Sequence, residues 1–210
     1  MPNNTVATPH AARPQRVVLV HGMFQSGNHF RSMKRRLNAA GHLVLTPNLK
    51  PADARHGIEP LAEQLASCIK DTWNDEAHVL IAHSMGGLIC RYYMQQLDGA
   101  ARCRGLATLA TPHHGTAMAH LYPGLGARQM KPNSDFLRKL RESEHCIAPL
   151  PLLSFRTPLD LMILPSTSSH WLCAQNHRLW ILTHAQLPYD QHIQSMLIDW
   201  IETLPNEQHA

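Results

Sequence analysis

A serine stands where an apolar run gives way to a helical pattern, between two small residues. The segment reads Ala82-His83-Ser84-Met85-Gly86. A serine hydroxyl is a poor nucleophile unless a base takes its proton, and it must project into the space that a substrate occupies. The spacing small-x-Ser-x-small is typical of a sharp strand-to-helix turn that does this, here with alanine in the first small position. A small-residue turn that only eases packing is the alternative, but three further features favour a nucleophile.

Two backbone N–H groups are candidates for stabilising the oxyanion that forms when Ser84 attacks a carbonyl. One is the N–H of Met85, which opens the helix after the serine. The other is the N–H of Met23, in the loop after an early strand that ends in His-Gly. Gly22 lets the backbone turn toward the site. A plain strand-to-helix turn is the alternative for this loop.

An acid and a histidine follow later strands. Asp160 comes shortly after an expected strand at 151–155, and His184 comes directly after an expected strand at 178–183. The chain order Ser84, Asp160, His184 is the order expected for a catalytic triad on a parallel sheet of this kind. We therefore expect His184 to act as the base and Asp160 to orient it and stabilise its cation.

Other residues compete for these roles and fit them less well. His192 lies inside the final helical pattern, as a surface or packing histidine would. His113 and His114 precede the acid, which is the wrong order. Asp190 stands just before the final helix and is typical of a helix cap. His83, beside the serine, is interpreted as a packing residue of the turn.

Short apolar runs alternate with amphipathic helical patterns, and this alternation predicts about six strands in a mostly parallel sheet with helices on both faces. The expected strands cover residues 16–20, 42–47, 78–82, 104–112, 151–155 and 178–183. The expected helices cover residues 28–41, 57–73, 86–97, 134–142 and 191–204.

The domain organisation expected from the sequence is simple. Residues 1–15 read as a flexible N-terminal segment, and residues 16–210 read as a single domain with a short insertion at about 113–150. The insertion is too short for a large cap domain. Its one helical stretch carries Phe136, Leu137 and Leu140, and we expect it to pack on the body of the domain, with a roof over the site as the alternative.

Composition excludes several classes of protein. The chain has 210 residues, 44% apolar and 16% charged, which fits one globular core and not a disordered chain. The formal charge is +4, but the basic residues are scattered on helical patterns, so no nucleic-acid partner is expected. The longest apolar runs are too short for a transmembrane helix.

Histidines and cysteines suggest neither a metal site nor a disulfide framework. The 16 histidines are dispersed without ligand spacing, and the five cysteines form no C-x-x-C pair. Reduced thiols and the lack of an apolar leader at the start of the sequence favour a cytoplasmic location. We expect no metal and no cofactor.

Several motifs together resemble a known family. The segments AHSMGG (82–87) and YYMQQLDG (92–99) resemble the small, lidless bacterial triacylglycerol lipases of the α/β-hydrolase superfamily, which also carry alanine before the serine motif. LDLMIL (159–164) is similar to their acid loop, and THAQLPYDQHIQSML (183–197) to their histidine loop. LATPHHGT (109–116) resembles a GTPHHG segment of a broader bacterial esterase and lipase group. Thr183 and the residues after Asp160 depart from the usual forms of these loops.

The resemblance covers residues 16–204 and implies an α/β-hydrolase fold and a serine carboxylic ester hydrolase that works through an acyl-enzyme. Its substrate would be a small-molecule or lipid ester. An acyltransferase or a thioesterase would use the same residues, and a non-catalytic binding protein is a further alternative. The natural ester, the acyl chain length and the oligomeric state stay open at this point.

Overall fold

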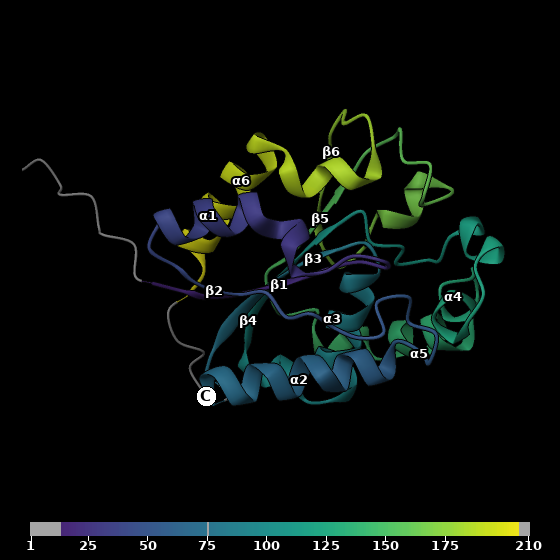
Figure 1. Cartoon of the computed structure of the whole chain (residues 1–210), viewed down its shortest axis with the longest axis horizontal. Helices are drawn as coiled ribbons and strands as arrows, with labels where there is room; N and C mark the ends of the chain where they lie inside the picture. Colours follow the sequence, from purple (N-terminus) through teal and green to yellow (C-terminus); the bar gives the residue numbers. More distant parts are fainter. Residues whose placement is uncertain (1–13, 75, 206–210) are drawn as a thin grey trace, which may run out of the picture.

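Parallel strands form the centre of the molecule (Figure 1). The structure is a computed structural model and describes residues 14–74 and 76–205. Within these residues a six-stranded sheet has the order β2-β1-β3-β4-β5-β6, with every neighbouring pair parallel. The strands are β1 (Arg16–Val20), β2 (Leu43–Leu45), β3 (His78–His83), β4 (Cys103–Leu109), β5 (Leu152–Arg156) and β6 (Gln175–Arg178).

Helices cover both faces of this sheet. In Figure 1, α1 and α6 lie on one side of the strands, and α2 and α3 lie on the other. The helices are α1 (Arg31–Ala39), α2 (Glu59–Trp73), α3 (Met85–Gln96), α4 (Leu125–Gln129), α5 (Asp135–Glu142) and α6 (Gln191–Thr203). The predicted mostly parallel sheet with helices on both faces is therefore confirmed.

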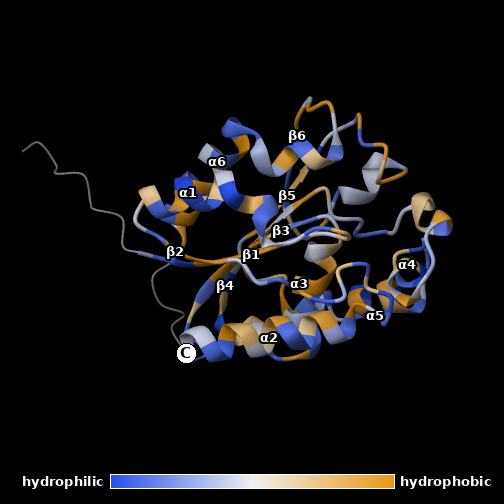
Figure 2. Cartoon of the chain, in the orientation of Figure 1, coloured by the Kyte–Doolittle hydropathy of each residue, from blue (hydrophilic) through white to orange (hydrophobic). Residues whose placement is uncertain are grey.

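The central strands are apolar throughout because both of their faces are buried. In β1, Val18 and Val20 belong to the core on the side of α2 and α3, whereas Val17 and Leu19 belong to the core on the side of α1 and α6. Successive side chains of a strand point to opposite faces, so a strand with two buried faces needs a continuous apolar run. The hydropathy colouring of Figure 2 shows the apolar strands between helices whose outer surfaces are polar.

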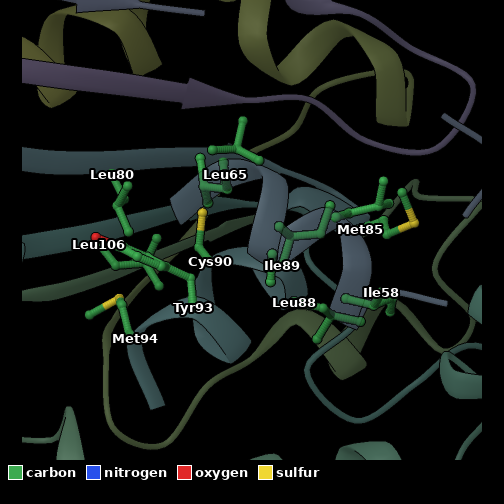
Figure 3. Packing of buried hydrophobic residues seen from close by; sticks show 14 of the residues in the cluster. Ile58, Leu65, Leu80, Met85, Leu88, Ile89, Cys90, Tyr93, Met94 and Leu106 are labelled. Carbon is green, nitrogen blue, oxygen red and sulfur yellow. The ribbon is translucent and has the colours of Figure 1, made fainter. Parts of the chain in front are cut away.

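The core beside α3 is the larger one and fixes the helix that follows Ser84. Figure 3 shows Ile89, Cys90 and Tyr93 of α3 packed with Leu65 of α2 and Leu80 of β3. These five side chains are all 5% exposed or less. A helix held by this much buried apolar surface gives the residues at its first turn a fixed position.

The strand order places a crevice at the carboxyl ends of β1 and β3. The chain builds the sheet outward from β1 to β2 and then returns to add β3 on the other side of β1. The loops that leave β1 and β3 therefore run to opposite faces of the sheet. Open parallel sheets bind ligands at such a point, and Gly22 and Ser84 are the residues found there.

The sixth strand is not where the sequence predicted it, at residues 178–183. Strand β6 is Gln175–Arg178, and it pairs with β5 only as far as Arg156, where β5 ends. The Leu179 N–H still donates to the Arg156 carbonyl at 2.9 Å, and beyond it the chain leaves the sheet. The apolar run that suggested a strand instead forms a loop, in which Trp180 and Leu182 are 70% and 74% exposed.

The segment 113–150 contains α4, α5 and short 3₁₀ turns. The prediction that its amphipathic helix packs on the body of the molecule is confirmed, because Phe136, Leu137 and Leu140 of α5 join the core beside α3. The Phe136 ring also stacks on Tyr92 at 5.9 Å between centroids. Of the expected flexible segment at 1–15, residues 1–13 lie outside the described residues.

Candidate active site

Ser84 occupies a sharp, strained turn between β3 and α3. Its backbone has φ 55° and ψ −128°, a combination that non-glycine residues rarely adopt. The turn is held from both sides, because the Ser84 N–H donates to the Leu109 carbonyl at 2.8 Å and the Thr111 hydroxyl donates to the Ser84 carbonyl at 2.9 Å. The strain persists because these bonds and the packed helix over-determine the turn.

Close packing explains the small residues around the serine. A Cβ at Gly86 would lie 2.3 Å from the Val20 carbonyl oxygen, and a Cβ at Gly22 would lie 2.9 Å from the Ser84 Cβ. Ala82 is fully buried in β3. The loop after β1 and the first turn of α3 can therefore approach each other only because both carry glycine.

Asp160 and His184 form a buried pair beside this turn. The His184 Nδ1 lies 2.8 Å from the Asp160 Oδ2, and Asp160 is only 3% exposed. The other carboxylate oxygen accepts the N–H groups of Met162 at 2.8 Å and Ile163 at 2.9 Å. An ionised carboxylate can only accept a hydrogen bond, so Nδ1 must be the donor. A neutral His184 therefore carries its proton on Nδ1, and Nε2 is left with a lone pair. His184 does not directly follow β6, as the sequence suggested, but opens the 3₁₀ helix η6 (His184–Tyr189).

One pocket brings Ser84 and His184 together. It has a volume of about 230 Å³. Most of the residues that line it are apolar. Four of them are methionines, whose flexible side chains adapt to ligands of different shape. The residues that line it are Met23, Phe24, Gln25, Ser84, Thr116, Met118, Ala119, Tyr122, Met130, Met162, Ile163, His184 and Ala185.

The two expected oxyanion donors belong to two segments that come close to Ser84. Met23 lines the pocket from the loop after β1. Met85 is the first residue of α3, where a helix leaves its backbone N–H groups without acceptors in the preceding turn. The positive end of the helix dipole adds to the attraction for an anion there. The Met85 side chain is buried in the core beside α3 (Figure 3).

Gln25 was missed by the sequence analysis and connects three loops of the site. Its Oε1 accepts the Gly22 N–H at 3.0 Å and lies 3.0 Å from the Nδ1 of His83. The Nε2 of His83 in turn lies 3.1 Å from the backbone carbonyl oxygen of His184. The chain of contacts thus runs from the loop after β1 through the serine turn to the loop that carries His184. No spacing rule in the sequence identifies Gln25.

His83 packs in the turn, as expected, and each of its two ring nitrogens also lies close to an oxygen atom. It is fully buried, and burial holds its pKa well below the ordinary value, with the neighbouring His184 adding to the effect. A neutral imidazole carries one proton, whereas both ring nitrogens of His83 face acceptor oxygens. The rings of His83 and His184 lie 4.6 Å apart, and His29 stacks on His83 at 5.0 Å. His83 therefore contacts His184 at two points, the backbone carbonyl of His184 and the His184 ring, and helps to position it.

The competing residues lie in other surroundings. His192 is exposed on α6, and the Asp190 side chain caps that helix by accepting the Ile193 N–H at 2.9 Å. His113 is buried, with its Nε2 3.1 Å from the Thr108 hydroxyl. The segment resembling GTPHHG therefore supplies His113 to the core. Among these histidines only His184 lines the pocket that Ser84 lines, and Asp160 is the acid that contacts it.

Two absences can be stated for the part of the chain that the structure describes. Residues 14–74 and 76–205 contain no cluster of three or more His, Cys, Asp or Glu side chains suited to a metal ion. None of the helices in these ranges is both long enough and apolar enough to cross a membrane.

Comparison with known sequences points to one family. The chain matches the family described as alpha/beta hydrolase fold over residues 15–129. The lysosomal thioesterase PPT2 of Homo sapiens is 30% identical over 95 residues, which are 43% of this chain and 32% of the thioesterase. A carbendazim hydrolyzing esterase of Nocardioides sp. (strain SG-4G) is 27% identical over 113 residues, which are 50% of this chain and 46% of the esterase. Less than half the length of each of these curated relatives is matched.

Solved structures show the same fold over nearly the whole chain. Aspergillus fumigatus lipase B superposes with a TM-score of 0.74 at 19% identity, covering 92% of this chain and 54% of the lipase. The mature form of Bacillus licheniformis lipase BlEst2 superposes with a TM-score of 0.73 at 16% identity, covering 94% of this chain and 95% of the lipase. At such identities the likeness concerns the fold.

Proposed function

The chain belongs to the alpha/beta hydrolase fold family, and from this membership we propose that it is a serine hydrolase of carboxylic esters. The observation that carries the proposal is the 2.8 Å contact between His184 and Asp160 at the pocket that Ser84 also lines. A strained serine, a histidine with a free ring nitrogen and an acid that orients this histidine are the parts that acyl transfer requires.

The mechanism we propose has two steps. His184 Nε2 takes the proton of Ser84 as the hydroxyl oxygen attacks the ester carbonyl, and the same proton then passes to the departing alcohol. Water attacks the resulting acyl-enzyme with His184 again acting as the base. Asp160 accepts a hydrogen bond from the His184 Nδ1–H throughout and stabilises the imidazolium, and no cofactor enters either step.

The oxyanion would be held by the N–H groups of Met23 and Met85. Such donors act on charge that develops in the transition state, and losing one typically costs about 2.7–4 kcal/mol of transition-state stabilisation. The glycine contacts support this role, because they bring the loop after β1 close to Ser84 and to the first turn of α3.

The substrate we propose carries an apolar acyl group, since the pocket beside Ser84 is walled mainly by methionines and other apolar side chains. Segment 113–150 contributes Thr116, Met118 and Met130 to these walls while α5 packs on α3. This arrangement fits a small lipase or esterase without a large cap. We further propose that residues 16–210 form one domain with this segment as its insertion.

Thioester hydrolysis is the second candidate activity. It is favoured by the lysosomal thioesterase relative, which is 30% identical over 95 residues. The same triad would serve, because only the leaving atom changes from oxygen to sulfur. Matched butyrate esters and thioesters measured on the same enzyme would separate the two activities.

Ester hydrolysis by single-residue variants tests the assignment of the base. With p-nitrophenyl butyrate as substrate, His184→Ala should lower kcat by about 10³-fold or more. His192→Ala is the matched control, because His192 is exposed on α6, and it should stay within twofold of wild type. The opposite ranking would reassign the base.

The same assay tests the acid by replacing each of the two candidate aspartates with asparagine. Asp160→Asn should fold and lose most activity, because an amide no longer stabilises the imidazolium; an equivalent change in a serine protease lowers kcat about 10⁴-fold. Asp190→Asn should keep its activity and lose at most about 1 kcal/mol of stability as a weakened cap. Collapse of activity in Asp190→Asn alone would show that Asp160 is not the acid.

A further inference from the structure

A second hollow adjoins the pocket of Ser84 at His184. Its volume is about 200 Å³. It shares three wall residues with the first pocket, so the two hollows are neighbours and His184 lines both: Met162, His184 and Ala185. Its remaining walls come from the loops that carry the acid and the histidine: Leu159, Leu161, Leu182 and Thr183.

Large apolar side chains in this hollow are exposed without a structural reason. Leu161 is 75% exposed and Leu182 is 74% exposed. Leu182 belongs to the apolar run that leaves the sheet after β6 and contributes nothing to the strand pairing. Neither core contains Leu161 or Leu182, and exposed apolar side chains at the wall of a hollow beside His184 are suited to contact with an apolar ligand.

The chemistry of acyl transfer decides which part of a substrate lies there. The proton that His184 takes from Ser84 is delivered to the leaving atom, so the leaving group must lie against His184. The first pocket holds Ser84 and ends on buried side chains, among them Ala119 at 2% and Met130 at 7% exposure. The pocket of Ser84 therefore suits the acyl chain. The second hollow, which His184 also lines, is left for the alcohol part of the ester.

We propose that the hollow bounded by Leu159, Leu161 and Leu182 is the subsite for the leaving group, and that it takes an alkyl alcohol. The preferred substrate is then an ester that is apolar on both sides of its carbonyl. In the acylation step the Ser84 Oγ forms a bond to the carbonyl carbon, the bond from that carbon to the alkoxy oxygen breaks, and His184 gives its Nε2 proton to that oxygen. This assignment rests on the proposed esterase function.

The subsite is tested with alkyl butyrates in which only the alcohol grows, from ethyl through butyl to hexyl. The pKa of these alcohols hardly changes along the series, so intrinsic reactivity stays constant and kcat/KM for acylation reports binding in the subsite. A fully buried methylene is worth about fourfold. In a half-open hollow we expect kcat/KM to rise about tenfold from ethyl to hexyl butyrate, with all esters kept below their solubility limits.

The double variant Leu161→Ser/Leu182→Ser should reduce this hexyl-to-ethyl ratio to about one. Its ratio for ethyl hexanoate over ethyl butyrate, which reports the acyl pocket, should match that of wild type. Leu172→Ser is the matched control, since Leu172 is 84% exposed and lines neither hollow, and it should keep both ratios.

The outcomes are distinguishable. A flat alcohol series in wild type, or a ratio that the double variant keeps, would overturn the subsite while ester hydrolysis and the proposed function stand. A double variant that loses activity only on emulsified esters would make the leucines a lipid-docking surface instead. If no ester in either series is hydrolysed, the proposed function and the subsite fail together.

Discussion

Gln25 shows how one side chain can link parts of a site that come from distant segments. Its amide oxygen contacts the Gly22 N–H and the ring of His83, and His83 contacts the carbonyl of His184. Gly22 immediately precedes Met23, the proposed oxyanion donor. Gln25 is therefore placed to hold the loop after β1 against the serine turn. It contacts the residue before the proposed oxyanion donor directly, and it is connected to the proposed base through His83.

Gln25→Ala should lower kcat by about tenfold with little change in KM. The removed contacts hold groups that act on the transition state, and one lost hydrogen bond to a group left buried costs about 1–3 kcal/mol. Steady-state kinetics on p-nitrophenyl butyrate and a thermal melt check this. Gln64→Ala is the matched control, because Gln64 also pairs with a loop backbone, at Lys50, but lies outside the pocket. Equal kinetics for the two variants would contradict a positioning role.

At the scale of elements, the contact between α3 and β1 assembles the site. A Cβ on Gly86 would meet the carbonyl oxygens of Val20 at 2.3 Å and His21 at 2.7 Å. Both are backbone atoms at the end of β1, and they cannot rotate away as a side chain can. The distance between the loop after β1 and Ser84 therefore depends on the absence of a side chain at this position.

Gly86→Ala should destabilise the protein by about 1–3 kcal/mol through overpacking, although alanine is the better helix former. Activity should fall as well, because the end of β1 must shift. Gly41→Ala is the control: a Cβ there meets nothing within 4 Å, and only its positive φ of 88° opposes the change, at a cost of about 1 kcal/mol. Urea unfolding and kcat/KM are the measurements. A stable, fully active Gly86→Ala would contradict the close contact.

The regular elements were largely predictable because their patterns are local. The run at 16–20 is strand β1 and the amphipathic pattern at 57–73 is helix α2, each within a few residues. The expected strand at 178–183 was wrong, because pairing with β5 ends at Arg156. Beyond that point Leu179 and Ile181 pack against the core, and Leu182 lines the hollow beside His184. A single sequence does not distinguish apolar residues that serve a sheet from those that line a cleft.

Candidate site residues could be predicted from the sequence where they follow strands in an expected chain order. Residues that join the site only through contacts in space could not. Ser84, Asp160 and His184 were chosen for their places after strands, and the structure brings the last two within 2.8 Å. Gln25 was missed, because its partner His83 lies 58 residues away and its spacing follows no motif. The contacts that His83 makes with Gln25 and with the His184 carbonyl were missed for the same reason.

At the scale of the whole molecule, burial of histidines couples stability to pH. Burial is the main cause of lowered pKa values at His21, His83 and His113. It also lowers the pKa of His29 to about 4. In the unfolded chain these groups titrate near 6.5. The folded state therefore keeps neutral histidines that the unfolded state protonates.

The free energy of unfolding should fall as the pH is lowered from 7.5 to 5. Between pH 6.5 and the lower folded-state pKa values the unfolded chain binds more protons, so each such histidine removes up to about 1.4 kcal/mol per pH unit. Urea unfolding at pH 7.5, 6 and 5 measures the slope. His113→Gln should reduce it, whereas His145→Gln, at an exposed position, should leave it unchanged. A flat profile, or equal slopes for both variants, would contradict the neutral buried state.

Covalent labelling tests the proposed triad most directly. A fluorophosphonate reacts with a serine only when a base activates its hydroxyl, so peptide mass mapping of the labelled wild-type protein should place one adduct on Ser84. Ser84→Ala should take up no label, and His184→Ala should react at least about 10²-fold more slowly. An adduct on a different serine, or an unlabelled Ser84 in protein that hydrolyses esters, would contradict the account.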